Sequence, residues 1–384
     1  NDADIIHADE TAESELQEYA IPDAYLNWIE AEGVKRIVDY TFADLNEVEL
    51  SPWDRKGGSG AIITIPFDAL PNDAHLVEIR PGGKSEPEHH MYELQVYVLS
   101  GLGATSIWLD DKRKSTFEWR AGSLFSIPLN AWYQNFNASG SEPARYVAVT
   151  NAPPIMRLFK DNDFVFNCDY GFSSRYAGAE DYFNGSGRQF KRRVWESNFI
   201  PNAPDLPLFA WDGRGAGGIN AMLEMAGNSM KAHISEFPIG TYKKAHRHGP
   251  GAHLILLSGD AGYSLLWQKE DMSDLRKSDW KKGAMVVIPD EGTYHQHFNS
   301  GKRRARYLAL RAGNHGLGAP FASNPPGGDV SMKEGGRQVE YGDEARRIHE
   351  IFEAELAKNG AICRMKAFIP YCTGEIGPTS ARET

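Results

Sequence analysis

Five of the twelve histidines in this chain lie in two short segments, and their spacing suggests that they act together. His246 and His248 are two residues apart, as are His295 and His297, and His253 follows a turn-like Gly-Pro-Gly sequence. Residues i and i+2 of a strand point to the same face, so each pair should project together. Imidazole is a common ligand for iron, zinc, copper and nickel, and binds manganese less often. The pattern therefore predicts one divalent metal held between the strands of a barrel.

Other side chains near these histidines could contact a substrate. Lys244 and Tyr242 lie two and four residues before His246, so strand alternation predicts that all three share one face. A lysine beside a metal could anchor a carboxylate or an enolate; the alternative is a rim residue whose ammonium group reaches solvent. Tyr263 and Arg311 are further candidates for substrate contact.

An internal repeat indicates that the chain contains two copies of one domain. The matching segments are 53–55 and 211–213, 98–101 and 256–259, 127–128 and 288–289, 134–137 and 296–299, and 144–146 and 305–307. The matches keep their order along the chain, and short insertions accumulate between them. A gene duplication explains this pattern.

Each copy consists of short apolar runs separated by turn residues, which favours an all-β sandwich or barrel. In the second copy the runs are His253–Leu257, Tyr263–Trp267, Met285–Ile288 and Tyr307–Leu310. Helical periodicity occurs mainly near the ends, over Asp23–Glu32 and over Asp343–Lys358, where Gly360 is a plausible stop.

The residues around the histidines resemble two known motifs of the cupin superfamily. Gly240, His246, His248, His253 and Gly259 match the first motif, which normally has Glu at the position of His253. Pro289, Gly292, His295 and Asn299 match the second motif, with one extra residue between proline and glycine. The resemblance covers roughly residues 50–155 and 208–315.

This resemblance implies an all-β fold of tandem double-stranded β-helix (jelly-roll cupin) barrels with short terminal helices. The metal would be bound in the second barrel by His246, His248 and His295, with His253 in place of the usual Glu. The expected division is an N-terminal helical arm (1–45), a first cupin (46–183), a linker (184–207), a second cupin (208–318) and a C-terminal extension with a helix (319–384).

The histidine pairs also resemble gentisate-type bicupin dioxygenases, which hold Fe(II) on histidines without the Glu. More loosely, the chain resembles bacterial bicupins labelled ethanolamine ammonia-lyase activating proteins. We therefore expect an Fe(II)-dependent dioxygenase that acts with O₂ on a small aromatic or enolisable substrate, with His297 or Lys244 assisting as acid–base or anchor. The alternatives are a Zn-, Ni- or Mn-dependent isomerase or lyase, and a non-enzymatic activator module that binds a metal or ligand.

The first copy has lost most of these histidines. Its ligand positions hold Glu88, His90 and Gln95, and the position of His295 falls on Tyr133 or Gln134. We expect this barrel to be structural and metal-free; the alternative is a weak site formed by Glu88, His90 and Glu93.

The composition limits the possible partners. A formal net charge of -11 argues against nucleic acid and anionic membranes as partners. No long apolar run or basic-then-apolar leader is present, and the three cysteines show no C-x-x-C spacing, so we expect a cytoplasmic protein with reduced thiols. By analogy with other barrels that have exposed edge strands, we expect a homodimer or larger homo-oligomer.

Overall fold

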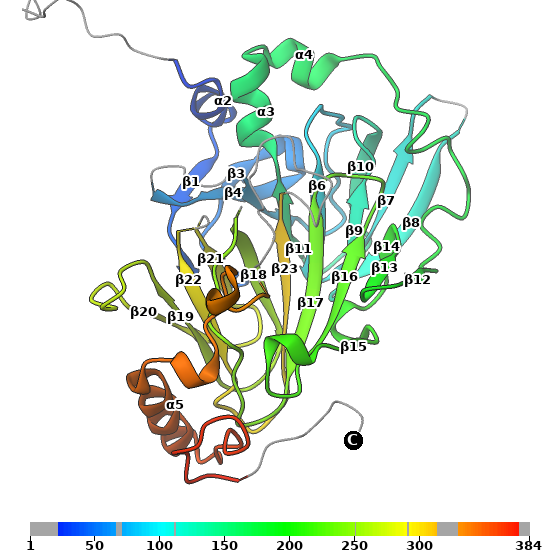
Figure 1. The fold of residues 1–384 in the computed structure, drawn as a ribbon. Helices are drawn as coiled ribbons and strands as arrows, with labels where there is room; N and C mark the ends of the chain where they lie inside the picture. The colour runs from blue at the N-terminus through cyan, green and yellow to red at the C-terminus, as the bar shows by residue number, and fades with distance from the viewer. Residues whose placement is uncertain are drawn as a thin grey trace, which may run out of the picture.

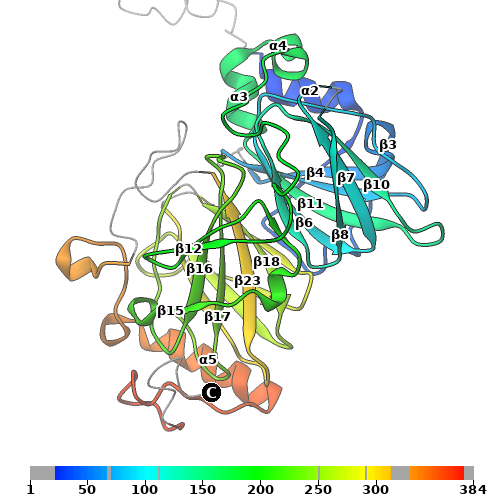
Figure 2. The same ribbon diagram turned by 90° about the vertical axis from the view of Figure 1, so that its right-hand side faces the viewer.

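The computed structural model describes residues 22–66, 71–110, 113–249, 251–289, 292–312 and 329–375, which form two β-barrels in tandem. In Figure 2 the first barrel (blue to cyan) lies at the upper right and the second (green to yellow) at the lower left. Each barrel pairs one large sheet with one three-stranded sheet. This mostly β architecture confirms the predicted fold class.

The large sheet of the first barrel has the order β1-β4-β5-β11-β6-β9-β14, with β3 paired to β4, and the small sheet has the order β10-β7-β8. The bounds are β1 Lys35–Val38, β3 Ser51–Trp53, β4 Gly58–Thr64, β5 Asp73–Ile79, β6 Leu94–Ser100, β7 Leu102–Trp108, β8 Ser115–Arg120, β9 Leu124–Ile127, β10 Trp132–Asn137, β11 Ala144–Thr150 and β14 Phe199–Ile200.

The second barrel repeats this order. Its large sheet runs β12-β13-β16-β17-β23-β18-β21-β2, with β15 paired to β16, and its small sheet runs β20-β19-β22. The bounds are β2 Thr41–Phe42, β12 Arg188–Phe190, β13 Val194–Glu196, β15 Phe209–Ala210, β16 Ile219–Glu224, β17 Lys231–Phe237, β18 Ala252–Ser258, β19 Gly262–Trp267, β20 Arg276–Trp280, β21 Met285–Ile288, β22 Tyr294–Phe298 and β23 Ala305–Arg311.

The two large sheets pack back to back through a shared apolar core. Residues that alternate along each strand face this core, for example Val147 and Val149 of β11 and Leu308 and Leu310 of β23. The residues between them point into their own barrel. This alternation decides which side chains can reach a site inside the second barrel.

Each barrel also receives a short strand from the segment that precedes the other one. β2 lies before the first barrel in sequence but pairs with β21 of the second, whereas β14 lies between the barrels and pairs with β9 of the first. Residues 184–207, which we expected to be a linker, thus supply β12 and β13 to one large sheet and β14 to the other.

Helices cover the ends of the molecule (Figure 1). α2 (Ala24–Glu32) begins after the capping side chain of Asp23 and ends at Gly33, whose φ of 65° favours glycine. α5 (Arg346–Asn359) ends at Gly360, with a φ of 62°. Both helices agree with the predicted ones within three residues at each end. The part of the chain that the structure describes also contains α3 (Ala152–Phe159) and α4 (Asn162–Asn167), with 3₁₀ turns at 54–56, 203–205, 212–214, 332–334 and 341–343.

Within the described residues, no helix combines the length and the apolar character needed to cross a membrane.

Candidate metal centre

Three imidazoles converge inside the second barrel. His295 lies on β22, and His246 lies on the adjoining segment, which pairs with β22 through a bridge between these two residues. One ring nitrogen from each of His246, His248 and His295 lies within 4.8 Å of the other two. The ring centroids of His246 and His295 are 4.1 Å apart. His246 and His295 are buried and His248 is partly exposed.

A divalent metal fits this group because the ring nitrogens are available in the required form. Nδ1 of His246 lies 3.2 Å from the carbonyl oxygen of Lys244, and Nδ1 of His295 lies 3.3 Å from that of Thr293. A carbonyl can only accept, so each Nδ1 carries the proton and each Nε2 keeps its lone pair. Nδ1 of His248 is buried without a hydrogen-bond partner. These three residues could therefore hold one divalent metal.

The surroundings of the three histidines are cationic. Arg214 and Arg311 are buried, and both lower the pKa of His248 and His295. The largest cause of the lowered histidine pKa values is burial, which brings that of His295 to about 3. Among the described residues, no carboxylate contributes to the pKa shifts of these two rings. The site therefore holds neutral imidazoles in a positive field.

A buried lysine, Lys243, also lies within the barrel. Its Nζ is 3.3 Å from the hydroxyl of Tyr307 and 4.9 Å from the centre of that ring. Burial, together with the charge of Arg214, holds the pKa of Lys243 well below its usual range. Lys243 is therefore suited to be a neutral amine that can accept a proton.

His297 lies beside the three histidines but outside their cluster. It is buried, and its Nδ1 is 2.9 Å from the hydroxyl oxygen of Ser264. Its ring centroid is 5.5 Å from that of His295 and 5.0 Å from that of Tyr307. This position is compatible with the predicted supporting or substrate-contacting role.

His253 does not join the cluster, contrary to our expectation for the position of the usual Glu. His253 lies on β18, opposite Val287 and Leu310 of the neighbouring strands. It is two residues before Ile255 and therefore points to the same face of β18, which is the face that packs in the core between the barrels. Strand alternation places the barrel interior on the other face of β18. Both ring nitrogens of His253 are buried, and neither has a hydrogen-bond partner among the described residues.

Lys244 also does not share the face of His246. Its ammonium forms an ion pair with Glu340 at 2.6 Å. The alternation fails because the pairing with β22 is irregular. Tyr242 pairs with Phe298 and His246 pairs with His295, so the stretch from Tyr242 to His246 is one residue longer than the stretch of β22 that it faces. The extra residue turns Lys243, instead of Lys244, toward the barrel interior.

Tyr242 and Tyr263, the predicted substrate-binding tyrosines, lie on the outside of the barrel. The Tyr263 ring stacks on Phe298 with centroids 4.5 Å apart, and the Tyr242 ring packs edge-on against Phe352 of α5. Phe298 follows the inward-pointing His297 and so faces outward. These tyrosines are covered by α5, whereas Arg311 is the predicted substrate contact that does lie close to the histidines.

Sequence reasoning missed Arg214, Lys243 and Tyr307. The repeat contained a usable signal for Arg214, because the offset that aligns 53–55 with 211–213 places Lys56 opposite it. A cation therefore occupies the same position in both copies. Lys243 was missed because nothing in the sequence marks the irregular pairing.

The first barrel fills the equivalent positions with groups that satisfy one another. Glu88 bridges to Tyr133 as His246 bridges to His295. Nζ of Lys56 contacts both carboxylate oxygens of Glu88, at 2.6 and 2.7 Å. Nδ1 of His90 contacts the carbonyl of Tyr92 at 2.7 Å, and its Nε2 contacts the hydroxyl of Tyr133 at 3.0 Å.

The alternative cluster of Glu88, His90 and Glu93 does not form. Glu93 accepts hydrogen bonds from Arg175 and from Ser229 and Met230 near the start of β17, so it links the two barrels.

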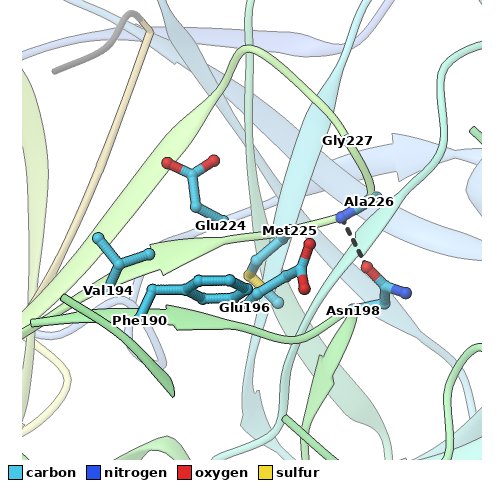
Figure 3. Close-up of a pocket in the computed structure, with 8 residues that line it drawn as sticks. All are labelled: Phe190, Val194, Glu196, Asn198, Glu224, Met225, Ala226 and Gly227. Atoms are coloured by element: carbon cyan, nitrogen blue, oxygen red, sulfur yellow. Dashed lines mark hydrogen bonds between the residues drawn. The ribbon is translucent and has the colours of Figure 1, made fainter. Parts of the chain in front are cut away.

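A shallow pocket of about 290 Å³ lies elsewhere, between β12, β13 and the end of β16 (Figure 3). None of the barrel histidines lines it. Its two carboxylates are already paired, Glu196 with Arg188 and Glu224 with Lys231. The close convergence of imidazoles makes the barrel interior the better candidate site.

Comparisons with known proteins leave the function open. No family model matches the chain, and no curated protein matches it. Among solved structures, the chain is similar to the oxalate decarboxylase of Bacillus subtilis at pH 4.6, with 12% identity, a TM-score of 0.47, and coverage of 75% of this chain and 78% of that one. A structure of the same enzyme studied for its Mn(II) centres gives 13% identity and the same TM-score, with 75% and 80% covered.

Proposed function

We propose that the second barrel is a metal-dependent lyase or isomerase that acts on a small carboxylate. The observation that carries this proposal is the charge of the interior, where buried Arg214 and Arg311 add to a metal site with neutral ligands. Buried arginines beside neutral metal ligands favour a substrate that carries negative charge.

The arginines would bind the substrate carboxylate. A guanidinium can form two parallel hydrogen bonds with a carboxylate, and such bonds are strong when water is excluded. Arg311 lies at the end of β23, and Arg214 is held by a 3.1 Å hydrogen bond to Gln338 from the C-terminal part of the chain. When bound, a divalent metal would polarise a carbonyl or carboxylate oxygen of the substrate.

Lys243 would then move a proton. A buried amine whose pKa is lowered can act as a general base near neutral pH. Tyr307 lies within hydrogen-bond distance of Lys243 and next to His297, so a proton could pass between the amine and the phenol. This pair favours proton transfer at a substrate carbon, which is a lyase or isomerase step.

The test is hydrogen exchange with solvent. The protein is loaded without oxygen with Mn, Zn, Ni or Fe(II) and incubated in D₂O with a panel of small hydroxy, keto and dicarboxylic acids. NMR should show deuterium entering the substrate or product. Lys243→Met should abolish this exchange, whereas the adjacent Lys244→Met should keep it. Absence of exchange and turnover across the panel would contradict the proposal.

The predicted Fe(II) dioxygenase is the second candidate, because the described residues supply three imidazoles and no carboxylate to the cluster. In that case Fe(II) protein should consume O₂ with an aromatic or enolisable acid, and zinc should not support activity. Turnover with zinc in the absence of O₂ would exclude this candidate.

A further inference from the structure

A second cluster of side chains that could bind a metal lies outside the barrel. It forms where α5 meets the part of the C-terminal extension that follows this helix (residues 361–375). His349 and Glu353 are one helical turn apart on α5, and Cys363 and Cys372 come from the extension. One donor atom from each of the four lies within 4.8 Å of the others. The sulfur atoms are 3.3 Å apart, and Nε2 of His349 is 3.1 Å from Oε1 of Glu353.

These distances suit a tetrahedral cation. Zinc–sulfur bonds of about 2.3 Å place two thiolates roughly 3.7 Å apart, so the observed sulfur contact needs only a small adjustment. His349, Cys363 and Cys372 are buried, and Glu353 is partly exposed, which leaves a way in for the ion. Two sulfurs, one imidazole and one carboxylate are a donor set that zinc accepts.

The hydrogen bonds of His349 orient it for this role. The hydroxyl of Tyr242 donates to Glu344 at 2.6 Å, so its oxygen can accept the Nδ1 proton of His349 at 3.2 Å. Nε2 then keeps a lone pair that faces the carboxylate oxygen of Glu353. Two acceptors at 3.1 Å need either a proton or a cation between them, and a bound metal ion would meet this need.

We propose that His349, Glu353, Cys363 and Cys372 bind a structural zinc ion, distinct from the metal of the barrel. This ion fastens the C-terminal extension to α5. The extension in turn holds the segment that leads to His246, because Arg364 donates its backbone N–H to the carbonyl of Gly240 at 2.8 Å. The second ion thus supports the position of one ligand of the first.

Cobalt substitution of the full-length wild-type protein tests the proposal without a mutation that could prevent folding. Zinc is removed with a chelator and Co(II) is added. The expected result is an intense near-ultraviolet thiolate-to-cobalt band. The band should persist in the His246→Ala/His295→Ala variant, whose barrel site is lost. Cobalt binding without this band in the wild type would overturn the proposal.

Variants and thiol counting complete the test. Untagged wild-type protein should contain about two divalent ions per chain, and Cys363→Ser/Cys372→Ser should lose one of them as zinc. Cys168→Ser, which changes a cysteine outside the cluster, should lose none. After zinc is removed and the chain is denatured without a reductant, we expect a thiol titration to find three thiols per chain. A single thiol would show that Cys363 and Cys372 form a disulfide instead, and would overturn the proposal, as would an unchanged zinc content after both cysteines are replaced.

Discussion

The two barrels share a fold and differ in how their polar interiors are balanced. In the first, Lys56 is paired with Glu88, and Asp73 accepts hydrogen bonds from Tyr25 and Thr150 while contacting His75. In the second, the positions of Lys56 and Glu88 hold Arg214 and His246. The strand register likewise puts Arg311 opposite Lys231, where the first barrel has Thr150 opposite Asp73.

Under the proposed function, this difference separates a structural interior from one that binds ligands. The first barrel neutralises its own charges, which stabilises a buried polar network. In the second barrel, neutral imidazoles lie beside buried arginines, and under the proposed function a bound metal and an anionic substrate would stabilise this arrangement. The same fold can therefore be used for structure or for chemistry by changing a few inward-facing side chains.

The largest expected effect is on metal content. His246→Ala/His295→Ala should reduce the ion bound in the second barrel from about one per chain to near zero, because one imidazole cannot hold the metal alone. The matched Glu88→Ala/Tyr133→Phe variant of the first barrel should keep the wild-type content. Elemental analysis of untagged protein measures both. Metal loss in the second variant alone would reverse the assignment of the two barrels.

The next effect is on stability. Lys56→Met leaves the buried carboxylate of Glu88 without its partner and should lower the free energy of unfolding by roughly 3–5 kcal/mol. Arg214→Met removes the hydrogen bond to Gln338 and should cost less, about 1–2 kcal/mol. Urea titrations compare the two variants. Equal losses would show that the two interiors are balanced in the same way.

A pH dependence should distinguish the two faces of the shared core, where His253 corresponds to Gln95. Burial lowers the pKa of His253 in the folded protein to about 4, whereas its pKa in the unfolded chain is near 6.5. Between pH 6.5 and pH 4 this histidine is therefore protonated in the unfolded chain and neutral in the folded protein. Stability supplied by neutral His253 is present above pH 6.5 and is lost as the pH falls toward 4, by about 3 kcal/mol in total.

His253→Gln should therefore flatten the decrease in the free energy of unfolding between pH 7 and pH 4, and Gln95→His should steepen it. Chemical unfolding at a series of pH values measures this slope. An unchanged slope in His253→Gln would mean that this ring is not held neutral.

The smallest expected effect is that of Lys244→Met. Its ion pair with Glu340 is partly exposed, so the free energy of unfolding should change by about 0–1 kcal/mol and the metal content should not change. Measuring both checks that the irregular pairing has turned this lysine away from the site. Loss of metal would contradict that placement.

The sequence predicted the parts of the site that depend on a regular backbone. The His-x-His spacing brought His246 and His248 to one face, and the repeat together with the glycine pattern predicted the barrels. Where the backbone departs from regular alternation, prediction failed. His253 belongs to a new strand after a turn. The alternation of inward- and outward-pointing residues before the turn does not continue into that strand. One extra residue between Tyr242 and His246 exchanged the orientations of Lys243 and Lys244.

Residues of the C-terminal extension could not have been placed from the sequence either. Cys363 and Cys372 are nine residues apart and show no familiar metal-binding spacing, and His349 and Glu353 look like an ordinary helical pair. Their convergence depends on how the chain returns to α5 after Gly360. Such long-range packing has no local signature.

The reciprocal strands β2 and β14 make the two halves mutually dependent for folding. If the chain were cut between the barrels, the second barrel would lose β2, and β21 would have an open edge. A first half that ends before β14 would leave β9 with an open edge. The cut would also expose the apolar surfaces that now cover each other. Isolated halves should therefore aggregate, and the intact protein should unfold in one cooperative transition. The duplication has produced one folding unit, so neither barrel can be exchanged or lost independently.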